Sequence, residues 1–383
     1  MNSLEILNII GTGETSKVQF KEVLDDNEKV AGEMIAMSNS LGGVILFGVK
    51  DKTGEITGLT YEQIQKTGNT LATIASDFIQ PQIFIYTEAV KVGEQTVLVV
   101  HVKEGMAKPY KDRKGVIWVK QGCDKRRLTD NNEIIRLFQQ NGIIYADEMI
   151  VNDTSIEDVS KDAFSQYIEK LDNGDSEYEM TPTLLENMNI MKNGKLTLGG
   201  LLFFAKEPQK FRSSLCVKAI SFYGNDISGT EYRGSEDITG TLPEMFDKSM
   251  SFFKKNLQHV QSHQNFNSVG KLEISEIALE ELLQNALVHR DYTKNAPVRI
   301  AIFDNRVEII SPGRLPNSLT IENIKMGNAV ARNNLIVSYC SKMMNYRGFG
   351  SGILRALKNQ PDIDFKNDVD GEQFITTIPR LVM

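Results

Sequence analysis

The sequence predicts an α+β protein with more than one domain. Its 383 residues exceed the roughly 250 to 300 residues that one hydrophobic core usually serves. Two apolar patterns occur along the chain: helical spacing, as in "EKVAGEMIAMSNS", and short apolar runs bounded by glycine, as in "GGVILFGVK", which are typical of buried strands. Hydrophobic residues make up 41% of the chain and charged residues 24%, which is typical of folded globular proteins.

A first mixed domain is expected over residues 1–142. After the helix and strand just quoted, the sequence predicts a second helix, two strands around a "KVGEQ" turn, another strand and a last helix. These are "YEQIQKTGNTLATIASDFI", "QIFIYTEAV", "QTVLVVHVK", "GVIWVKQG" and "NNEIIRLFQQN". Asn39 is expected to cap the end of the first helix, and Gly42 and Gly43 to begin the strand that follows.

A middle segment over 143–272 is expected to pack against a last domain over 273–383. In the middle segment, "SIEDVSKDAFSQYIEKL" and "TPTLLENMNIM" have helical spacing, "KLTLGGLLFFAK" and "LCVKAISFYG" are predicted as strands, and "LPEMFDKSMSFFKKNLQHVQSH" as a long amphipathic helix. The last domain alternates a helix over 273–289, the strands "VRIAIFDN" and "RVEIISPG", a helix in "NLIVSYCSKMM" and the glycine-rich "RGFGSGILRAL".

Basic residues are concentrated in one segment of the first domain. The chain has a net charge of −7, yet residues 102–127 hold nine basic and three acidic residues, which leaves −13 for the rest. Such a segment can neutralise phosphates, with Tyr110 and Trp118 as stacking surfaces; a solvated charged hairpin is the alternative. The expected nucleic-acid contacts are Lys108, Lys111, Arg113, Lys114, Lys120, Lys125, Arg126 and Arg127.

The helix around "EELLQNALVHRDY" carries a polar stripe within apolar borders. Glu281, Asn285 and His289 are four residues apart and fall on one side of the helix. Burying an unpaired polar group costs about 1 to 3 kcal/mol, so such a stripe is either hydrogen-bonded internally or faces a cleft.

Two glycine motifs favour the cleft. "RGFGSGI" places Gly348, Gly350 and Gly352 directly before a helical run, where backbone N–H groups and the helix N-terminus can hold an anion. "EIISPGRLP" ends a strand in a tight turn at Gly313. A flexible turn is the alternative for the first motif.

This order of motifs resembles the nucleotide-binding domain of the GHKL ATPases. The resemblance implies that Glu281 positions a water molecule, that Asn285 ligates Mg²⁺ through the nucleotide, and that the glycines hold phosphates. Where those ATPases have an adenine-reading Asp, this sequence has Ser311. "NALVHRDY" and "IFDNRVEIISPGRLP" look most like the divergent, RecG-like or divergent AAA form found in transcriptional regulators. The expected ATP-binding residues are Asn285, His289, Gly313, Gly348, Gly350 and Gly352, with Glu281 catalytic if the protein is an ATPase.

The first domain resembles the Schlafen AlbA-type domain. The similarity is carried by "VQFKEVLDDNEKVAGEMIAMSNSLGGVILFGVKDKTGEITGL" and "KPYKDRKGVIWVKQGCDKRRLTDNNEIIRL". Together the resemblances imply an Alba-like mixed α/β domain followed by a GHKL-type α/β sandwich. Some Schlafen proteins cleave RNA through a carboxylate cluster that begins with two Glu five residues apart; here Glu14 is followed by Gln19, which argues against a nuclease even with Glu22 and Asp51 nearby.

The expected function is that of a prokaryotic, DNA-binding transcriptional regulator that binds DNA rather than RNA, with ATP and Mg²⁺ as cofactors. An active, weak ATPase or another nucleic-acid-processing enzyme, for instance in defence against foreign DNA, is a second hypothesis. A non-catalytic scaffold with degenerate pockets is a third. The sequence leaves open whether the protein forms a homo-oligomer.

Other features of the sequence limit these hypotheses. No window approaches the roughly 18 to 20 apolar residues of a membrane span, and the N-terminus lacks the pattern of a secretory signal. Cys123, Cys216 and Cys340 lie far apart, which fits a reducing cytoplasm and excludes a zinc site built from close cysteine pairs. His259 and His263 have no evident third ligand and are expected to be surface or packed residues.

Overall fold

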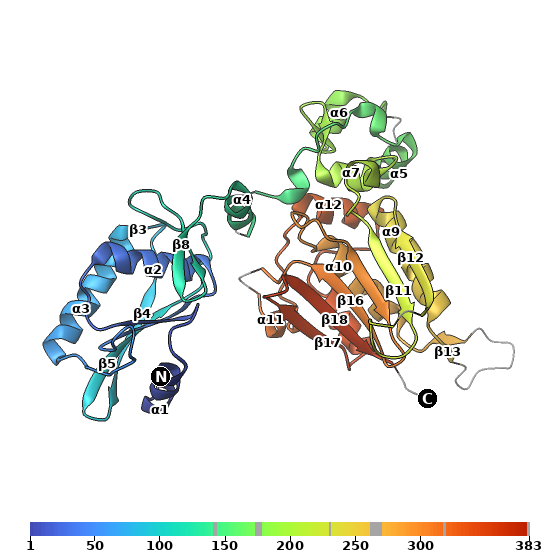
Figure 1. The fold of residues 1–383 in the computed structure, drawn as a ribbon. Helices are drawn as coiled ribbons and strands as arrows, with labels where there is room; N and C mark the ends of the chain where they lie inside the picture. Colours follow the sequence, from blue (N-terminus) through green and yellow to red (C-terminus); the bar gives the residue numbers. More distant parts are fainter. Residues whose placement is uncertain (141–143, 173–177, 230, 261–269, 317–318, 381–383) are drawn as a thin grey trace. The chain divides into compact units, whose positions relative to one another are not determined.

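The protein, seen in a computed structural model, divides into two compact units, Met1–Ile144 and Tyr145–Met383. The structure describes residues 1–140, 144–172, 178–229, 231–260, 270–316 and 319–380. Helices and strands are mixed in both units, so the α+β fold class is confirmed (Figure 1).

The first unit is built on a four-stranded sheet in the order β1-β2-β5-β4. Strands β1 and β2 are parallel, and the other pairs are antiparallel. Side chains alternate across β5: Leu98 and Val100 belong to the apolar cluster under α2 and α3, whereas Val97 and Val99 belong to the cluster under α1. Both faces are covered, which explains the continuous apolar runs of the sequence. The elements are α1 Ser3–Thr12, β1 Val18–Lys21, α2 Asn27–Asn39, β2 Gly43–Phe47, α3 Tyr61–Thr73, β4 Ile85–Val92 and β5 Gln95–Val102.

The basic segment forms short strands beside α2. A π-helical turn, Ile74–Phe78, leads into β3 (Ile79–Gln80), which pairs with β6 (Lys111–Asp112). The hairpin of β7 (Trp118–Gln121) and β8 (Asp124–Arg127) follows, and then α4 (Asn131–Gln140).

The cap expected at Asn39 is wrong. Its amide nitrogen donates to the carbonyl oxygens of Tyr110 (2.8 Å) and Trp118 (2.9 Å), and its amide oxygen accepts from the backbone N–H of Tyr110. Asn39 therefore fastens the basic segment to α2. The helix end is closed by Gly42, which has a φ of 69° and donates to the carbonyl of Met37.

The second unit is built on a six-stranded mixed sheet in the order β12-β11-β15-β16-β18-β17. Only the pairing of β11 with β15 is parallel among its described strands. Helices α9 and α10 lie against one face of this sheet (Figure 1). Helix α13 packs on α10. The elements are β11 Val217–Phe222, β12 Tyr232–Ile238, α9 Leu242–Asn256, α10 Glu276–Val288, β15 Val298–Ile302, β16 Arg306–Pro312, α11 Ile321–Lys325, α13 Gly352–Asn359, β17 Asp364–Asp368 and β18 Gln373–Pro379.

A helical part precedes this sheet in sequence and shares its core. One apolar cluster joins Phe204 and Leu202 to Leu283 and Ile300. The domain boundaries expected near 142 and 272 stay predictions. The remaining elements are the 3-10 turns Ala146–Glu148 and Ile156–Asp158, α5 Lys161–Asp172, α6 Pro182–Asn187, β9 Met191–Lys192, β10 Lys195–Leu196, α7 Leu198–Phe204, α8 Pro208–Phe211, β13 His259–Val260, β14 Lys271–Leu272 and α12 Asn334–Met343.

Two predictions in the middle segment are wrong. "KLTLGGLLFFAK" forms only a two-residue strand before α7, where the hydroxyl of Thr197 accepts from the N–H of Gly200 and caps the helix. The long amphipathic helix ends at Asn256, and His259 lies in β13. His263 lies outside the described residues. None of the described helices combines the length and apolar character that crossing a membrane requires.

Candidate functional site

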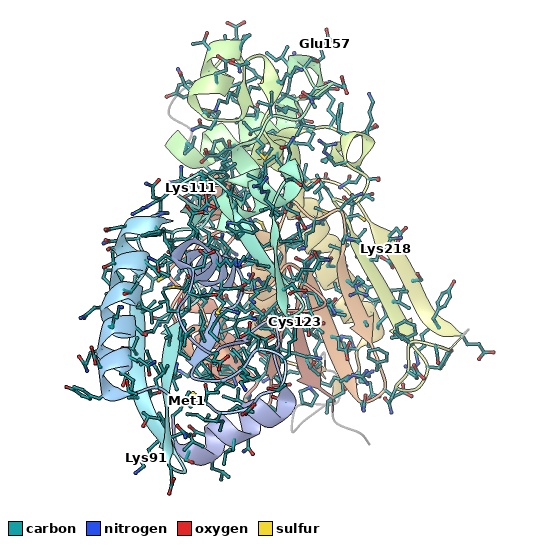
Figure 2. The ribbon with its side chains drawn as sticks, turned by 60° about the vertical axis from the view of Figure 1, so that its left-hand side comes forward. Met1, Lys91, Lys111, Cys123, Glu157 and Lys218 are labelled. Carbon is teal, nitrogen blue, oxygen red and sulfur yellow. The ribbon has the colours of Figure 1, made fainter. Side chains whose placement is uncertain are left out.

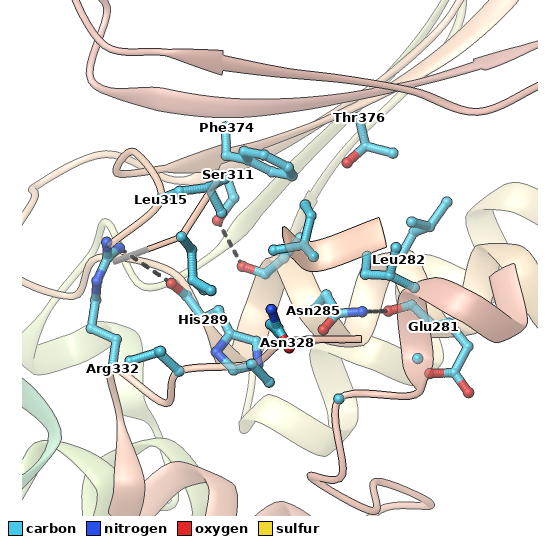
Figure 3. Close-up of a pocket in the computed structure, with 18 of the residues that line it drawn as sticks. Glu281, Leu282, Asn285, His289, Ser311, Leu315, Asn328, Arg332, Phe374 and Thr376 are labelled. Atoms are coloured by element: carbon cyan, nitrogen blue, oxygen red, sulfur yellow. Dashed lines mark hydrogen bonds between the residues drawn. The ribbon is translucent and has the colours of Figure 1, made fainter. Parts of the chain in front are cut away.

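Helix α10 provides one wall of a pocket in the second unit. Its apolar side, with Leu279 and Leu283, is buried in the core. Glu281, Asn285 and His289 line the pocket from the neighbouring side (Figure 3). The amide nitrogen of Asn285 donates to the carbonyl of Glu281 at 2.7 Å, so the amide oxygen is left to face the pocket.

The sheet provides the second wall. The register of β16 and β18 pairs Ser311 with Phe374 and Ile309 with Thr376. Because side chains alternate along strands, these four lie on the same face, and all four line the pocket. The Ser311 hydroxyl donates to the carbonyl of Ala286 on α10 at 2.8 Å (Figure 3). No partner for the Thr376 hydroxyl is found in the described part of the chain.

The glycine cluster provides the third wall. Gly348 and Gly350 have φ values of 63° and 77°, which favour glycine. A Cβ at Gly352 would lie 2.6 Å from Oε2 of Glu281, so the first residue of α13 approaches that carboxylate directly. No side chain of the described residues caps the first turn of α13.

All the residues expected at the ATP site therefore line one pocket. Its open space is about 1030 Å³ when the solvent at its mouth is included. The predicted residues that it gathers are Glu281, Asn285, His289, Gly313, Gly348, Gly350 and Gly352. Their roles stay predictions.

The pocket is positively charged, although the chain is acidic. Arginines 314, 332, 347 and 355 line it, and Glu281 is the acidic residue among its described lining. The guanidinium of Arg332 donates to the carbonyls of His289 (3.3 Å) and Arg314 (2.5 Å). Arg355 pairs with Glu281 at 2.5 Å. An excess of fixed positive charge in a partly enclosed pocket favours an anionic ligand.

Gly313 is required by the packing of Arg332. Its φ is 99°, and a Cβ there would lie 2.7 Å from Nη1 of Arg332 and 2.4 Å from Cβ of Asp291. Gly313 thus lets the turn after β16 pass close to both side chains.

His289 is neutral at physiological pH. Burial first, and the charge of Arg332 second, lower the pKa of His289 to about 4. Its Nε2 lies 2.8 Å from the hydroxyl of Tyr346, whose pKa burial raises. This hydrogen bond ties the end of α10 to the segment that leads into the glycine cluster.

Sequence reasoning missed several pocket residues. Thr376 could have been found from the alternation of β18, and Tyr346 from its position two residues before Gly348. Arg332 and Arg355 had no such signal, because their chain neighbours do not indicate which way they point. Within the described residues, no group of three His, Cys, Asp or Glu side chains is placed to hold a metal ion.

In the first unit, two of the expected nucleic-acid contacts do not reach the surface. The side chain of Lys108 is 0% exposed, and Nζ donates to Glu104 at 2.7 Å. The side chain of Lys120 is 1% exposed, and Nζ donates to Glu33 (2.9 Å) and Gln19 (2.8 Å). Neither lysine can contact phosphate from these positions. Tyr110 is also buried, so it offers no stacking surface.

The other six basic residues differ in what they contact. Lys125 pairs with Glu33, and Arg126 makes two hydrogen bonds of 2.8 Å to Glu133. Four are exposed: Lys111, labelled in Figure 2, Arg113, Lys114 and Arg127. The guanidinium of Arg113 lies 3.6 Å from the Phe78 ring centre, and that of Arg127 lies 5.9 Å from the half-buried Trp118 ring. Nucleic-acid binding by these residues stays a prediction.

Two of the carboxylates considered for a nuclease, those of Glu14 and Asp51, are held by other groups. Glu14 accepts hydrogen bonds from the side-chain amide of Gln19 and the backbone N–H of Phe20. Asp51 pairs with Lys21 at 2.7 Å.

Comparison with known proteins gave matches to three family models. Residues 14–129 match the model described as "Schlafen, AlbA_2", residues 295–374 match "Putative ATP-dependent DNA helicase recG C-terminal", and residues 136–214 match "Domain of unknown function (DUF8451)". A comparison with curated proteins gave no match.

The solved structures similar to the chain include the following two. The crystal structure of the DIP2311 protein from Corynebacterium diphtheriae has 20% identity and a TM-score of 0.48, over 99% of this chain and 80% of that one. The solution structure of the N-terminal domain of a "Putative ATP-dependent DNA Helicase RecG-related Protein" from Nitrosomonas europaea has 21% identity and a TM-score of 0.26, over 34% of this chain and 96% of that one. By its family-model matches, the chain carries an N-terminal Schlafen AlbA_2 domain and a C-terminal domain of the recG C-terminal type.

Proposed function

We propose that the protein is a DNA-binding transcriptional regulator whose second unit binds ATP with Mg²⁺. The observation that carries the proposal is the pocket, which gathers the polar stripe of α10, the glycine cluster and four arginines around one space. The match of residues 295–374 to the recG C-terminal model supports an ATPase-like domain, and the match of residues 14–129 to the Schlafen AlbA_2 model supports a role with nucleic acid.

The glycine cluster is suited to the phosphates. Without Cβ atoms at 348, 350 and 352, the backbone N–H groups before α13 can approach a phosphate, and the helix N-terminus favours negative charge there. The amide oxygen of Asn285 lies in the same pocket. Mg²⁺ is usually bound by one or two protein oxygens together with substrate phosphates, and it neutralises phosphate charge. One side-chain oxygen in the pocket that also contains the glycine cluster fits that pattern.

The sheet wall is suited to the adenine base. The proton of the Ser311 hydroxyl is used in the bond to Ala286, which leaves oxygen lone pairs to accept from the exocyclic amine of adenine. Thr376 on the same sheet face has a hydroxyl that can donate or accept. Ser311 can thus replace, with a neutral acceptor, part of what an Asp would provide.

Calorimetric titration of the full chain with ATP, with and without Mg²⁺, tests this proposal. We expect binding that Mg²⁺ strengthens, and we expect Asn285→Ala to remove most of the Mg²⁺ effect. Glu280→Gln is the control on α10, because Glu280 is exposed and does not line the pocket. Absence of heat with ATP under all conditions would overturn the nucleotide-binding proposal and favour a scaffold.

A further inference from the structure

The pocket contains an ion pair, between Glu281 and Arg355, that a bound nucleotide would contact. Nε of Arg355 donates to Oε1 of Glu281 at 2.5 Å, and Nη1 donates to the hydroxyl of Ser351 at 2.5 Å. The side chain of Glu281 is 12% exposed and that of Arg355 is 37% exposed. The pair is therefore enclosed on the Glu281 side and open to the pocket on the Arg355 side.

The place of Arg355 is unusual for a cation. It lies in the first turn of α13, which begins at Gly352. The N-terminal end of a helix carries partial positive charge, so an arginine there is unfavourable unless an anion accompanies it. Glu281 supplies that anion, and its Oε2 would lie only 2.6 Å from a Cβ at Gly352. The carboxylate of Glu281 therefore lies where helix and arginine both favour negative charge.

A phosphate group would compete for the same position. It carries more charge than a carboxylate, and the planar guanidinium of arginine matches two of its oxygens at once. A phosphate and the Glu281 carboxylate also repel each other. Arg355 can change partners because it pairs with a side chain, whereas Arg332 is bonded to backbone carbonyls that have no alternative position.

We propose that Arg355 reads the terminal phosphate of the bound nucleotide by exchanging Glu281 for it. The inference rests on the proposed ATP binding and adds how ATP is distinguished from ADP. In the exchange, the guanidinium keeps a hydrogen-bonded anion throughout, and the carboxylate of Glu281 is released only when the terminal phosphate is present. Glu281 is then free to accept a proton from water, so the same exchange would restrict water activation to the ATP complex.

The test is titration of the full chain with ATP and with ADP, both with Mg²⁺. We expect Arg355→Ala to weaken ATP binding about tenfold, the scale of one charge-assisted contact, and to change ADP binding less than about twofold. We expect Glu281→Gln to strengthen ATP binding by about two- to fivefold, because the phosphate no longer displaces a charged partner whose pairing is partly exposed.

Matched controls separate this effect from general loss of charge. Lys358→Ala removes a positive charge from α13 at an exposed residue outside the pocket lining, and Glu280→Gln removes a negative charge from α10 in the same way. Neither control should change the ratio of ATP to ADP affinity. Should Arg355→Ala fail to fold in a thermal unfolding scan, Arg355→Lys and Glu281→Gln carry the test, and Arg355→Lys should lose part of the discrimination.

The two proposals fail in different ways. If the unmodified chain binds neither nucleotide, the proposed ATP binding is overturned and this inference with it. If the unmodified chain binds ATP but the Arg355 variants keep its ratio of ATP to ADP affinity, only the role of Arg355 is overturned. Weaker ATP binding by Glu281→Gln would also contradict the exchange.

Discussion

At the scale of single residues, Asp147 is a buried acid at the beginning of the second unit. Its Oδ2 accepts from the backbone N–H groups of Leu335 (2.7 Å) and Ile336 (3.0 Å) and so caps α12. Burial outweighs these bonds and raises the pKa of Asp147 to about 6. Oδ1 of Asp147 has no hydrogen-bond partner among the described residues. The group therefore couples folding to pH.

The sign of this coupling follows from proton binding. In the unfolded chain the pKa of an Asp is about 3.9, so between about pH 4 and pH 6 the folded state holds more protons. Asp147 therefore contributes stability as the pH falls through 6, and loses that contribution as the pH rises. We expect Asp147→Asn to remove about 1 to 2 kcal/mol of the stability difference between pH 5 and pH 7.5. Urea unfolding of the unmodified chain and of Asp147→Asn at the two pH values measures this difference. If the variant keeps the same pH dependence of stability, Asp147 is not the group that couples folding to pH.

Single residues also mark the limit of prediction from sequence. Glu281, Asn285 and His289 could be placed in one pocket because a spacing of four fixes their side of a helix. Lys108 and Lys120 could not be placed correctly, because a basic segment gives no sign of the distant groups that its side chains contact in the fold. Lys108 donates to the carbonyl of Ser40 as well as to the nearby Glu104, and Lys120 pairs with Glu33 on α2.

At the scale of elements, most strands and helices were predicted, whereas α7 and the strands β1, β17 and β18 were not. Strands β2 and β5 are covered on both faces, so their apolar runs were recognisable between glycines and turns. Helix α7, Leu198–Phe204, is buried at every residue, and it therefore shows no helical period. A short apolar run of this kind cannot be assigned by periodicity alone.

The junction of α10 and α13 gives a prediction at this scale. Gly352→Ala would place a Cβ 2.6 Å from Oε2 of Glu281 and 3.2 Å from Nδ2 of Asn285, so the ends of these two pocket side chains must move. We expect the variant to lose at least about tenfold in ATP affinity, because a displacement of about 1 Å is enough to misplace bound groups. Isothermal titration measures the loss.

A glycine of α3 serves as the control. A Cβ at Gly68 meets nothing within 4 Å, and the residue lies inside the helix. Gly68→Ala should leave ATP affinity unchanged and raise stability by about 0.5 to 1 kcal/mol. Equal ATP affinity of Gly352→Ala and the unmodified chain would contradict the close approach of α13 to Glu281.

At the scale of the whole molecule, the exposed basic residues of the first unit predict a salt-dependent interaction with nucleic acid. Each phosphate contact that is lost should lower the slope of log affinity against log salt by about 0.9 on duplex DNA. We expect a variant in which Lys111, Lys114 and Arg127 are all replaced by alanine to reduce the magnitude of this slope by up to about 3. The control replaces Lys52, Lys66 and Lys91, which are exposed on the same unit. Anisotropy with duplex DNA, single strands and RNA measures the slope, and equal slopes for the two variants would contradict this surface.

Regulation requires that the two ligands affect each other. If ATP in the second unit changes the affinity of the first unit for DNA by some factor, DNA must change the affinity for ATP by the same factor. We expect a change of at least about fivefold, the lower end of usual coupling energies, between the complexes with ATP and with ADP. DNA titrations at saturating ATP, at saturating ADP and without nucleotide measure the effect of nucleotide on DNA affinity. ATP titrations with and without DNA measure the effect of DNA on ATP affinity.

The variants decide between a regulator and a scaffold. Asn285→Ala should bind DNA as tightly as the unmodified chain and should lose the nucleotide effect, because its change lies in the pocket of the second unit. The Arg355→Ala variant should bind DNA with the same affinity in the presence of ATP and of ADP, since it is expected not to distinguish the two nucleotides. If both ligands bind the unmodified chain but neither changes the affinity for the other, the ATP pocket does not regulate DNA binding. A coupling that survives Asn285→Ala would instead show that the effect does not pass through Mg²⁺ held by that amide.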